Sequence, residues 1–215
     1  MGVFPASSLK AVNNVSRETQ KRLTVFADLL VQWQGHINLI APSTIPDLWE
    51  RHIEDSLQYV IQFPNAKHWI DLGSGAGFPG LIAAIALVEN GGGRVDMVES
   101  VGKKCAFLRA VVRETGLRQA GVEVEVHNGR IENVLADLKT PDIVSARALA
   151  SLDKLLAFSY EFIAGETIGL FPKGRDHNEE IEFARQNWNF DCDIISSDLE
   201  ADSVLLKISN VEKRL

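Results

Sequence analysis

Residues 69–80 constrain the fold of this chain more than any other segment. Their sequence, W-I-D-L-G-S-G-A-G-F-P-G, is a short apolar run that ends in Asp71 and continues into a turn with four glycines. An apolar stretch over residues 81–88 follows and is long enough for a helix. A strand, a glycine-rich turn and a helix bring a nucleotide-like ligand against bare backbone, because glycine adopts positive φ and has no Cβ. The segment therefore predicts a nucleotide-type cofactor site in an α/β fold.

Two classes of cofactor fit this turn. Residues 75–80 match the G-x-G-x-x-G of dinucleotide-binding folds, and residues 71–77 match the acid-led G-x-G-x-G loop of S-adenosylmethionine (SAM) methyltransferases. Glu99 ends the next apolar stretch, where a carboxylate suits ribose hydroxyls in either class. The acid before the first glycine, Pro79 in the first helical turn and the long preceding segment favour the methyltransferase. A nicotinamide-dependent oxidoreductase remains the alternative, weakened by the lack of a hydride-transfer motif such as Y-x-x-x-K.

The chain is long enough for one substantial core plus an extension. It has 215 residues, of which 46% are hydrophobic. Apolar residues recur at helical spacing near the start, which predicts a helical N-terminal extension over residues 1–65. Strands and helices then alternate over residues 66–215, which predicts one compact domain built on a doubly wound, mostly parallel sheet. Its ligand is expected at the carboxyl ends of the first strands.

The sequence also predicts the bounds of these elements. In the extension, one helix is N-capped by Ser16 and a second spans residues 46–63. Strands are predicted at residues 69–72, 95–98, 122–126, 142–145, 167–171, 193–196 and 203–208, the last two as a hairpin-like pair. Helices are predicted at residues 80–88, 103–115, 131–138, 152–163 and 178–188.

Charge and cysteine content narrow the class of protein. The formal net charge of −7 disfavours a nonspecific nucleic-acid coat protein and leaves room for a local RNA-binding patch. Cys105 and Cys192 lack C-x-x-C spacing, so we expect no zinc, redox or other metal site. The first ten residues lack the features of a secretory signal, and the apolar run over residues 78–88 is too short to span a bilayer. These features predict a cytoplasmic protein that does not associate with membranes.

The candidate cofactor residues lie where predicted strands end. The full set is Asp71, Gly73, Ser74, Gly75, Gly77, Phe78, Glu99, Ile131, Glu132 and Arg147. Phe78 either covers the cofactor or attaches the following helix to the core. Ile131 and Glu132 either line the adenine or only begin a helix, with the acid complementing the helix dipole. Arg147, an arginine between alanines at a strand end, is expected to contact the cofactor or an RNA phosphate, or to position the reactants.

Basic residues form a second group of candidates. The candidates for RNA contact are Arg51, His52, Lys103, Lys104, Arg109 and Lys173. The alternative is an ordinary solvated helix face, and for His52 a structural histidine satisfied by hydrogen bonds.

The missing motifs bear on the atom that is methylated. The chain has neither the N/D-P-P-Y/F loop that grips an exocyclic amine nor a Pro-Cys nucleophile that attacks a pyrimidine carbon. Methylation of an oxygen, a thiol or a ring nitrogen remains open. Guanine N7 needs no general base, so the absence of a certain catalytic residue fits an enzyme that aligns nucleophile and methyl group.

Several short motifs in order resemble the RsmG family, also called GidB, of bacterial small-subunit rRNA guanine-N7 methyltransferases. They cover most of the chain: W-Q-G-H-I-N-L-I-A (33–41), R-H-I-E-D-S (51–56), D-L-G-S-G-A-G-F-P-G (71–80), E-S-V-G-K-K (99–104), N-G-R-I-E (128–132), S-A-R-A-L-A-S-L (145–152) and K-G (173–174). Two positions depart from the family pattern: Glu99 is often Asp in relatives, and Lys104 is often Arg, which would allow a bidentate phosphate contact.

The resemblance implies fold, activity and partner together. It implies a Rossmann-like class I SAM methyltransferase that acts on N7 of one guanine in 16S rRNA within the small ribosomal subunit, and we expect a monomer. Its cofactor positions correspond to Gly73, Phe78, Ile131, Glu132 and Arg147. A ribosome-binding factor that holds SAM without turnover remains a further alternative.

Overall fold

The protein is built around one seven-stranded sheet. The computed structural model describes residues 9–199 and 202–214. Within these residues the strand order is β3-β2-β1-β4-β5-β7-β6, in which β7 runs opposite to the other six strands. The strands are β1 (His68–Leu72), β2 (Gly93–Glu99), β3 (Val122–Asn128), β4 (Ile143–Ser145), β5 (Ile168–Lys173), β6 (Trp188–Ser196) and β7 (Val204–Lys213). The predicted doubly wound, mostly parallel sheet is confirmed.

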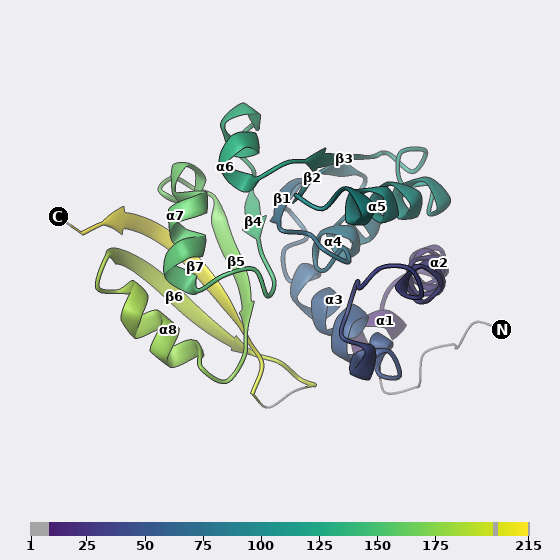
Figure 1. The fold of residues 1–215 in the computed structure, drawn as a ribbon, viewed down its shortest axis with the longest axis horizontal. Helices are drawn as coiled ribbons and strands as arrows, with labels where there is room; N and C mark the ends of the chain where they lie inside the picture. The colour runs from purple at the N-terminus through teal and green to yellow at the C-terminus, as the bar shows by residue number, and fades with distance from the viewer. Residues whose placement is uncertain (1–8, 200–201, 215) are drawn as a thin grey trace.

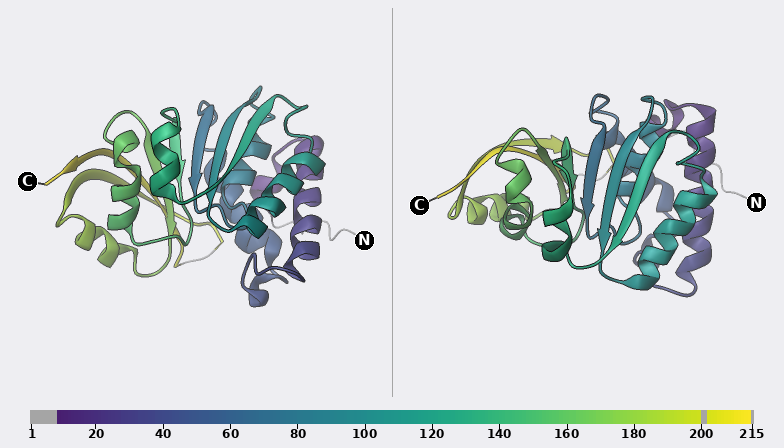
Figure 2. Two further views of the ribbon diagram at one scale, coloured as in Figure 1. Left: turned by 45° about the horizontal axis from the view of Figure 1, so that its top comes forward. Right: turned by 90° about the horizontal axis from the view of Figure 1, so that it is seen from above.

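Helices cover both faces of the sheet (Figures 1 and 2). One face carries α1 (Lys10–Asn13), α2 (Arg17–Gln34), α3 (Asp55–Val60), α4 (Gly80–Leu87) and α5 (Gly102–Glu114). The other carries α6 (Ile131–Val134), α7 (Leu152–Ile163) and α8 (His177–Ala184). In β1, Trp69 packs into the first of these cores and Ile70 into the second. A strand covered on both faces has apolar residues at successive positions, as β1 does at Trp69 and Ile70.

The N-terminal helices share a core with α4 and α5. Ser16 caps α2 as predicted, since the Thr19 N–H donates to Ser16 Oγ at 3.2 Å. The helix predicted at residues 46–63 instead consists of the π-helix η2 (Trp49–Glu54) followed directly by α3, which ends at Val60, and the 3-10 turn η1 (Pro42–Thr44) precedes both. The buried Glu54 ends the π-helix and accepts hydrogen bonds from two backbone N–H groups of α1, at 2.6 and 2.9 Å. Residues 1–8, in which no secretory signal is predicted, lie outside the described residues.

Other bounds differ by a few residues from those predicted. The helix expected at 131–138 ends at Val134 and continues as the 3-10 turn η3 (Leu135–Asp137). Helix α8 ends at Ala184 rather than at 188, because Trp188 begins β6 with a buried side chain that alternates with exposed ones. Strands β6 and β7 form the predicted antiparallel pair but are longer than expected. Pro79 is the N-cap of α4.

A buried carboxylate joins the first three strands on the α6 side of the sheet. Asp96 on β2 is 1% exposed and pairs with Arg94 at 2.7 Å, His68 at 2.8 Å and His127 at 2.7 Å. Burial acts to raise the pKa of Asp96, but hydrogen bonds from His68, Arg94 and His127 hold it well below its usual range. Asp96 therefore links β1, β2 and β3 through its ion pairs and hydrogen bonds.

Strand β3 lies at the edge of the sheet, where unpaired backbone groups invite strand addition. Two arginines cover part of this edge: Arg109 donates to the Val126 carbonyl at 2.6 Å, and Arg118 donates to the Val124 carbonyl at 2.9 Å. The predicted RNA contact of Arg109 thus competes with a structural bond. None of the helices in the described part of the chain has the length and hydropathy needed to cross a membrane.

Candidate cofactor and substrate site

The turn after β1 depends on its glycines. Gly73, Gly75 and Gly77 have φ values of +64°, +53° and +91°, a region that disfavours other residues. A Cβ at Gly73 would lie 2.6 Å from Leu149 Cδ1, and one at Gly77 would lie 2.3 Å from Leu81 Cδ1. Both the backbone conformation and the close packing therefore require glycine, and the turn leaves its backbone open to a ligand.

Glu99 fastens this turn to the end of β2. Its side chain is buried, with the Gly75 N–H donating to Oε2 at 2.9 Å and the Val101 N–H donating to Oε1 at 2.8 Å. A carboxylate has about four lone-pair positions, so these two bonds leave acceptor capacity for two further donors. Glu99 can therefore position the loop and still accept from a vicinal diol.

Asp71 lies beneath the turn with one oxygen unused. It is 1% exposed, and Ser145 Oγ donates to its Oδ1 at 2.8 Å. Its Oδ2 finds no hydrogen-bond partner within residues 9–199 and 202–214. Burial raises the pKa of Asp71 to about 6, against the opposing effect of the Ser145 hydroxyl. The Gly80 N–H at the start of α4 and the Ser74 hydroxyl also act to lower this pKa, and a positive charge brought by a ligand would favour the ionised form further.

The turn faces a cleft of about 970 Å³. Nine of the predicted site residues line it: Gly73, Ser74, Gly75, Phe78, Arg147, Arg51, His52, Lys104 and Lys173. Asp71, Gly77 and Glu99 support the turn from outside this lining. The cleft thus combines the cofactor turn with basic side chains from four separate parts of the chain.

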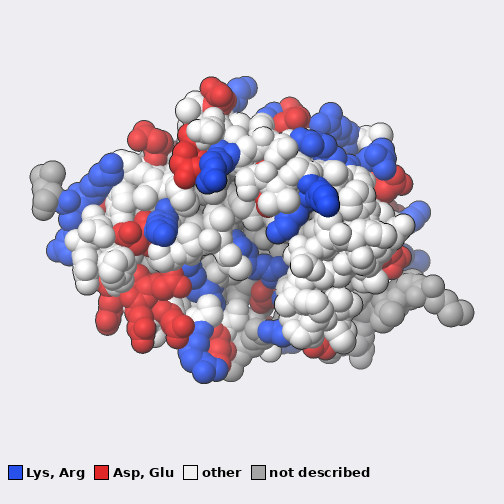
Figure 3. All heavy atoms as spheres, viewed as in Figure 1, with Lys and Arg blue, Asp and Glu red and all other residues white. Residues whose placement is uncertain are grey.

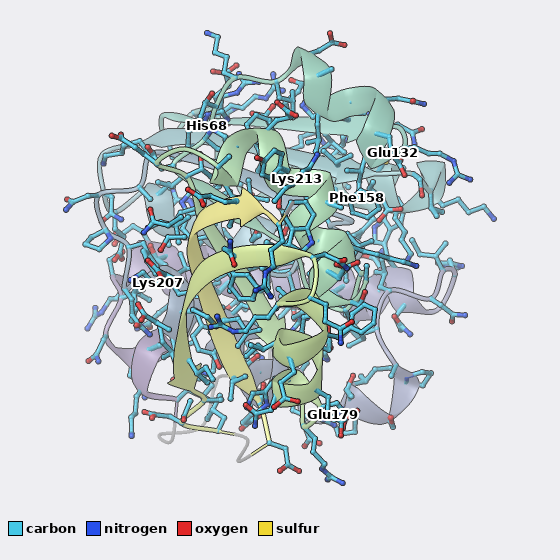
Figure 4. The ribbon with its side chains drawn as sticks, turned by 90° about the vertical axis from the view of Figure 1, so that its left-hand side faces the viewer. His68, Glu132, Phe158, Glu179, Lys207 and Lys213 are labelled. Carbon is cyan, nitrogen blue, oxygen red and sulfur yellow. The ribbon has the colours of Figure 1, made fainter. Side chains whose placement is uncertain are left out.

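Two predicted cofactor residues lie on α6, outside the cleft lining. Ile131 is half-buried against the core, and Glu132 is exposed (Figure 4). The turn before them is fixed to the end of β2, because the Gly129 N–H donates to the Glu99 carbonyl at 3.1 Å. Ile131 and Glu132 therefore begin a helix beside the strand end that carries Glu99.

Arg147 is held by residues of the N-terminal helices. Its Nη2 lies 2.9 Å from Nδ1 of His52, and its Nη1 lies 4.0 Å from Oδ2 of Asp55. Its guanidinium lies 4.7 Å from the centre of the Phe78 ring. The next residue, Ala148, has φ of +53°, a conformation that non-glycine residues adopt mainly where the surroundings enforce it. The sequence did not single out Asp55, although it lies within the quoted motif of residues 51–56.

The other basic candidates separate by their surroundings. The ammonium of Lys173 donates hydrogen bonds to the Ala150 carbonyl at 2.8 Å and to Glu180 at 2.6 Å, so it links the end of β5 to α8 and to the loop before α7. Lys103 lies in a separate groove of about 440 Å³ beside Trp33.

Figure 3 shows Lys and Arg atoms within the central hollow and a dense group of acidic atoms over α8. Acidic side chains on α8, which include Glu179, account for part of that group.

Comparison with known proteins settles the family. The family model for rRNA small subunit methyltransferase G, GidB, matches residues 19–200. The chain belongs to this family. It is 47% identical over 214 residues to Ribosomal RNA small subunit methyltransferase G of Rhizobium meliloti, which covers 97% of this chain and 98% of the relative. It is 50% identical over 201 residues to the protein of that name from Rhizobium leguminosarum bv. trifolii, with 93% and 96% covered.

Solved structures support the fold of this member of the GidB family. The O-methyltransferase TomG from Streptomyces achromogenes, in complex with SAM, is similar with a TM-score of 0.55 and 12% identity, covering 91% of each chain. The O-methyltransferase from Bacillus cereus, in complex with SAH, gives a TM-score of 0.53 at 13% identity, again covering 91% of each chain. The predicted Rossmann-like methyltransferase fold is confirmed. These findings favour a SAM-binding GidB protein over the nicotinamide alternative.

Proposed function

We propose that this protein transfers a methyl group from SAM to N7 of one guanine in 16S rRNA of the small ribosomal subunit. The observation that carries the proposal is a single cleft that joins the glycine turn to basic side chains, in a chain whose relatives are named Ribosomal RNA small subunit methyltransferase G. The resemblance of the ordered motifs supplies the atom and the base.

The residues around the turn fit SAM. The unpartnered Oδ2 of Asp71 is suited to the amino-acid end of the cofactor, and the free lone pairs of Glu99 to the ribose hydroxyls. Phe78 and Arg147 would border the cofactor from the cleft. Bound SAM supplies a methyl group on a positively charged sulfur.

The protein's own contribution is to orient the reactants. Guanine N7 carries a lone pair and loses no proton, so no general base is required. His52, the histidine in the cleft lining, already uses both ring nitrogens within the protein. The fixed turn, Glu99 and Arg147 would therefore act by alignment and by their local field.

We propose that RNA approaches the cleft through Arg51 and Lys104. Arg51 is exposed and Lys104 half-buried, and both line the cleft. In a chain of net charge −7, cations in the cleft and acids over α8 would draw phosphates toward the turn and away from that helix. Lys103, His52, Lys173 and Arg109 are less suited to direct contact, by their position or by their bonds within the protein.

We propose that the protein acts in the cytoplasm, in keeping with a ribosomal substrate, and that it acts as a monomer. The division at residue 65 into a helical extension and a methyltransferase domain is part of the same proposal. It is supported by helices up to α3 and by β1 beginning at His68. The ring of Phe78 in the turn packs on the ring of Phe26 in α2, with centres 5.0 Å apart. We therefore expect both the helical extension and the methyltransferase domain to be needed for cofactor binding.

Methyl transfer from radiolabelled SAM to small ribosomal subunits that lack the modification tests the proposal. We expect label on one 16S guanine, released under conditions that cleave N7-methylguanine. A Gly73→Asp variant, whose side chain cannot be accommodated beside Leu149, serves as the inactive control. Binding of SAM and subunits without transfer would instead support a non-catalytic ribosome factor, and label on another atom would refute the assignment to N7.

A further inference from the structure

His52 connects the N-terminal helices to the arginine of the cleft. It lies in the π-helix η2, with Nδ1 2.9 Å from Arg147 Nη2 and Nε2 2.9 Å from Thr44 Oγ1. All three residues line the cleft that contains the glycine turn. A π-helix is rare and often occurs at functional sites, and this one places a histidine against an arginine 95 residues further along the chain.

The hydrogen bonds around His52 are consistent with one tautomer only. A guanidinium donates and never accepts, so Nδ1 must present its lone pair to Arg147. The ring proton then lies on Nε2 and is donated to Thr44 Oγ1. The Thr44 hydroxyl in turn donates to the Ala41 carbonyl at 2.8 Å. The chain of donors therefore runs in one direction, from Arg147 to the backbone of Ala41.

The surroundings of His52 favour this neutral ring. Burial lowers its pKa to about 3, with further contributions from the charges of Arg147 and Arg51. The carboxylate of Asp55 faces Arg147 at 4.0 Å and balances that charge. A proton on Nδ1 would remove the acceptor and place two cations 2.9 Å apart.

Phe78 supports both partners. The imidazole packs on its ring with centres 5.3 Å apart and an angle of 26° between the planes. The Arg147 guanidinium lies over the same ring at 4.7 Å. Since Phe78 belongs to the cofactor turn, the histidine and the arginine both pack against that turn.

We propose that His52 is a positioning residue, which accepts a hydrogen bond from Arg147 and so directs the remaining guanidinium donors toward an anionic group in the cleft. This assignment rests on the proposed function. Two anions share the chemistry that Arg147 recognises: the carboxylate of the cofactor and a phosphate of the RNA. Holding a long arginine side chain in one rotamer before binding removes the entropy cost of ordering it later.

Two substitutions of nearly equal shape test the role of the acceptor. In His52→Asn, Oδ1 takes the place of Nδ1 and can still accept from Arg147, whereas His52→Leu has no acceptor. We expect His52→Leu to lower kcat/KM for methyl transfer roughly tenfold or more, and His52→Asn to retain it within about threefold. Equal losses in both variants, or full activity of His52→Leu, would overturn the proposal. A weaker SAM Kd in His52→Leu identifies the carboxylate as the anion, and a raised KM for subunits identifies the phosphate.

Nitrogen-15 NMR of the histidine rings tests the same idea without turnover. The signal that disappears in His52→Asn assigns His52 in the wild-type protein. We expect the Nε2–H tautomer, with no protonation down to about pH 5. An Nδ1–H tautomer or protonation near neutral pH refutes the positioning role, even where His52→Leu fails to fold. Absence of methyl transfer by the wild-type protein, with the expected tautomer, would count against the proposed function alone.

Discussion

Replacing Asp71 with asparagine separates the electrostatic cost of a buried carboxylate from its use in ligand binding. The ordinary pKa of 3.8 applies to the unfolded chain, and burial raises the pKa to about 6 in the folded protein. The folded state therefore holds the proton more tightly. Asp71 accordingly supports folding at low pH, and this contribution is lost as the pH rises from 3.8 through about 6.

The size of this effect follows from the two pKa values. Their difference, 6 − 3.8, is about 2.2 and corresponds to about 3 kcal/mol of unfolding free energy once the pH is well above both values. At about pH 4.5 only about 1 kcal/mol of that loss has developed. Between about pH 4.5 and about pH 7.5 the wild-type protein should therefore lose about 2 kcal/mol relative to Asp71→Asn.

Urea unfolding of both proteins at a series of pH values measures this difference directly. The asparagine keeps an acceptor for the Ser145 hydroxyl, so the hydrogen bond at Oδ1 is preserved in the comparison. We also expect SAM affinity at about pH 7.5 to fall at least tenfold, because the ligand loses a negatively charged acceptor beneath the turn. An unfolding free-energy difference that does not change with pH would refute the reasoning about the buried charge.

Three further predictions follow from the site and the sheet. Gly73→Ala should weaken SAM binding at least tenfold by calorimetry, because its methyl group meets Leu149, whereas Gly91→Ala (φ +82°, open space) should cost about 1 kcal/mol of stability and leave affinity unchanged. Equal affinities of the two variants would contradict this. In Glu99→Gln the side-chain NH2 group would face one of the two backbone N–H donors and could not accept from it, which disturbs the turn, so SAM affinity should fall roughly tenfold. Unchanged SAM affinity would show that Glu99 is not part of the site. Asp96→Asn should lower the unfolding free energy by about 3–5 kcal/mol with SAM affinity retained. Folding favours the ionised form of Asp96, so its contribution to the unfolding free energy is present above the ordinary pKa of 3.8 and declines as the pH falls below that value. An Asp96→Asn variant as stable as the wild-type protein near neutral pH would contradict this prediction.

Features that depend on a few neighbouring residues were predictable from the sequence. The glycine turn, the Ser16 cap and the end of β1 at Leu72 follow from local backbone preferences and apolar patterning. The place of Glu99 at the end of β2 beside the glycine turn was also predictable, because parallel strands present their carboxyl ends at one edge of the sheet.

Contacts between distant segments were not predictable in this way. The sequence grouped His52 with RNA-binding residues, yet its partner Arg147 is 95 positions away and only the fold brings them together. The π-helix that presents His52 ends at Glu54, whose carboxylate accepts a hydrogen bond from α1, 43 residues earlier in the chain. Lys173 was predicted as a candidate for RNA contact, and a basic residue in a sequence does not show that Glu180 will pair with it.

The arginines on β3 also bear on how copies of this protein meet one another. An unprotected edge strand offers its carbonyls to any extended segment, including the same strand of another molecule. Here the carbonyls of Val124 and Val126 already accept hydrogen bonds from Arg118 and Arg109, respectively. A second strand that paired along this edge would have to displace both guanidinium groups, at about 1.5–3 kcal/mol for each charged hydrogen bond. Crowded or partly unfolded molecules would thus meet an energetic barrier to sheet-to-sheet aggregation at the edge where the parallel part of the sheet ends.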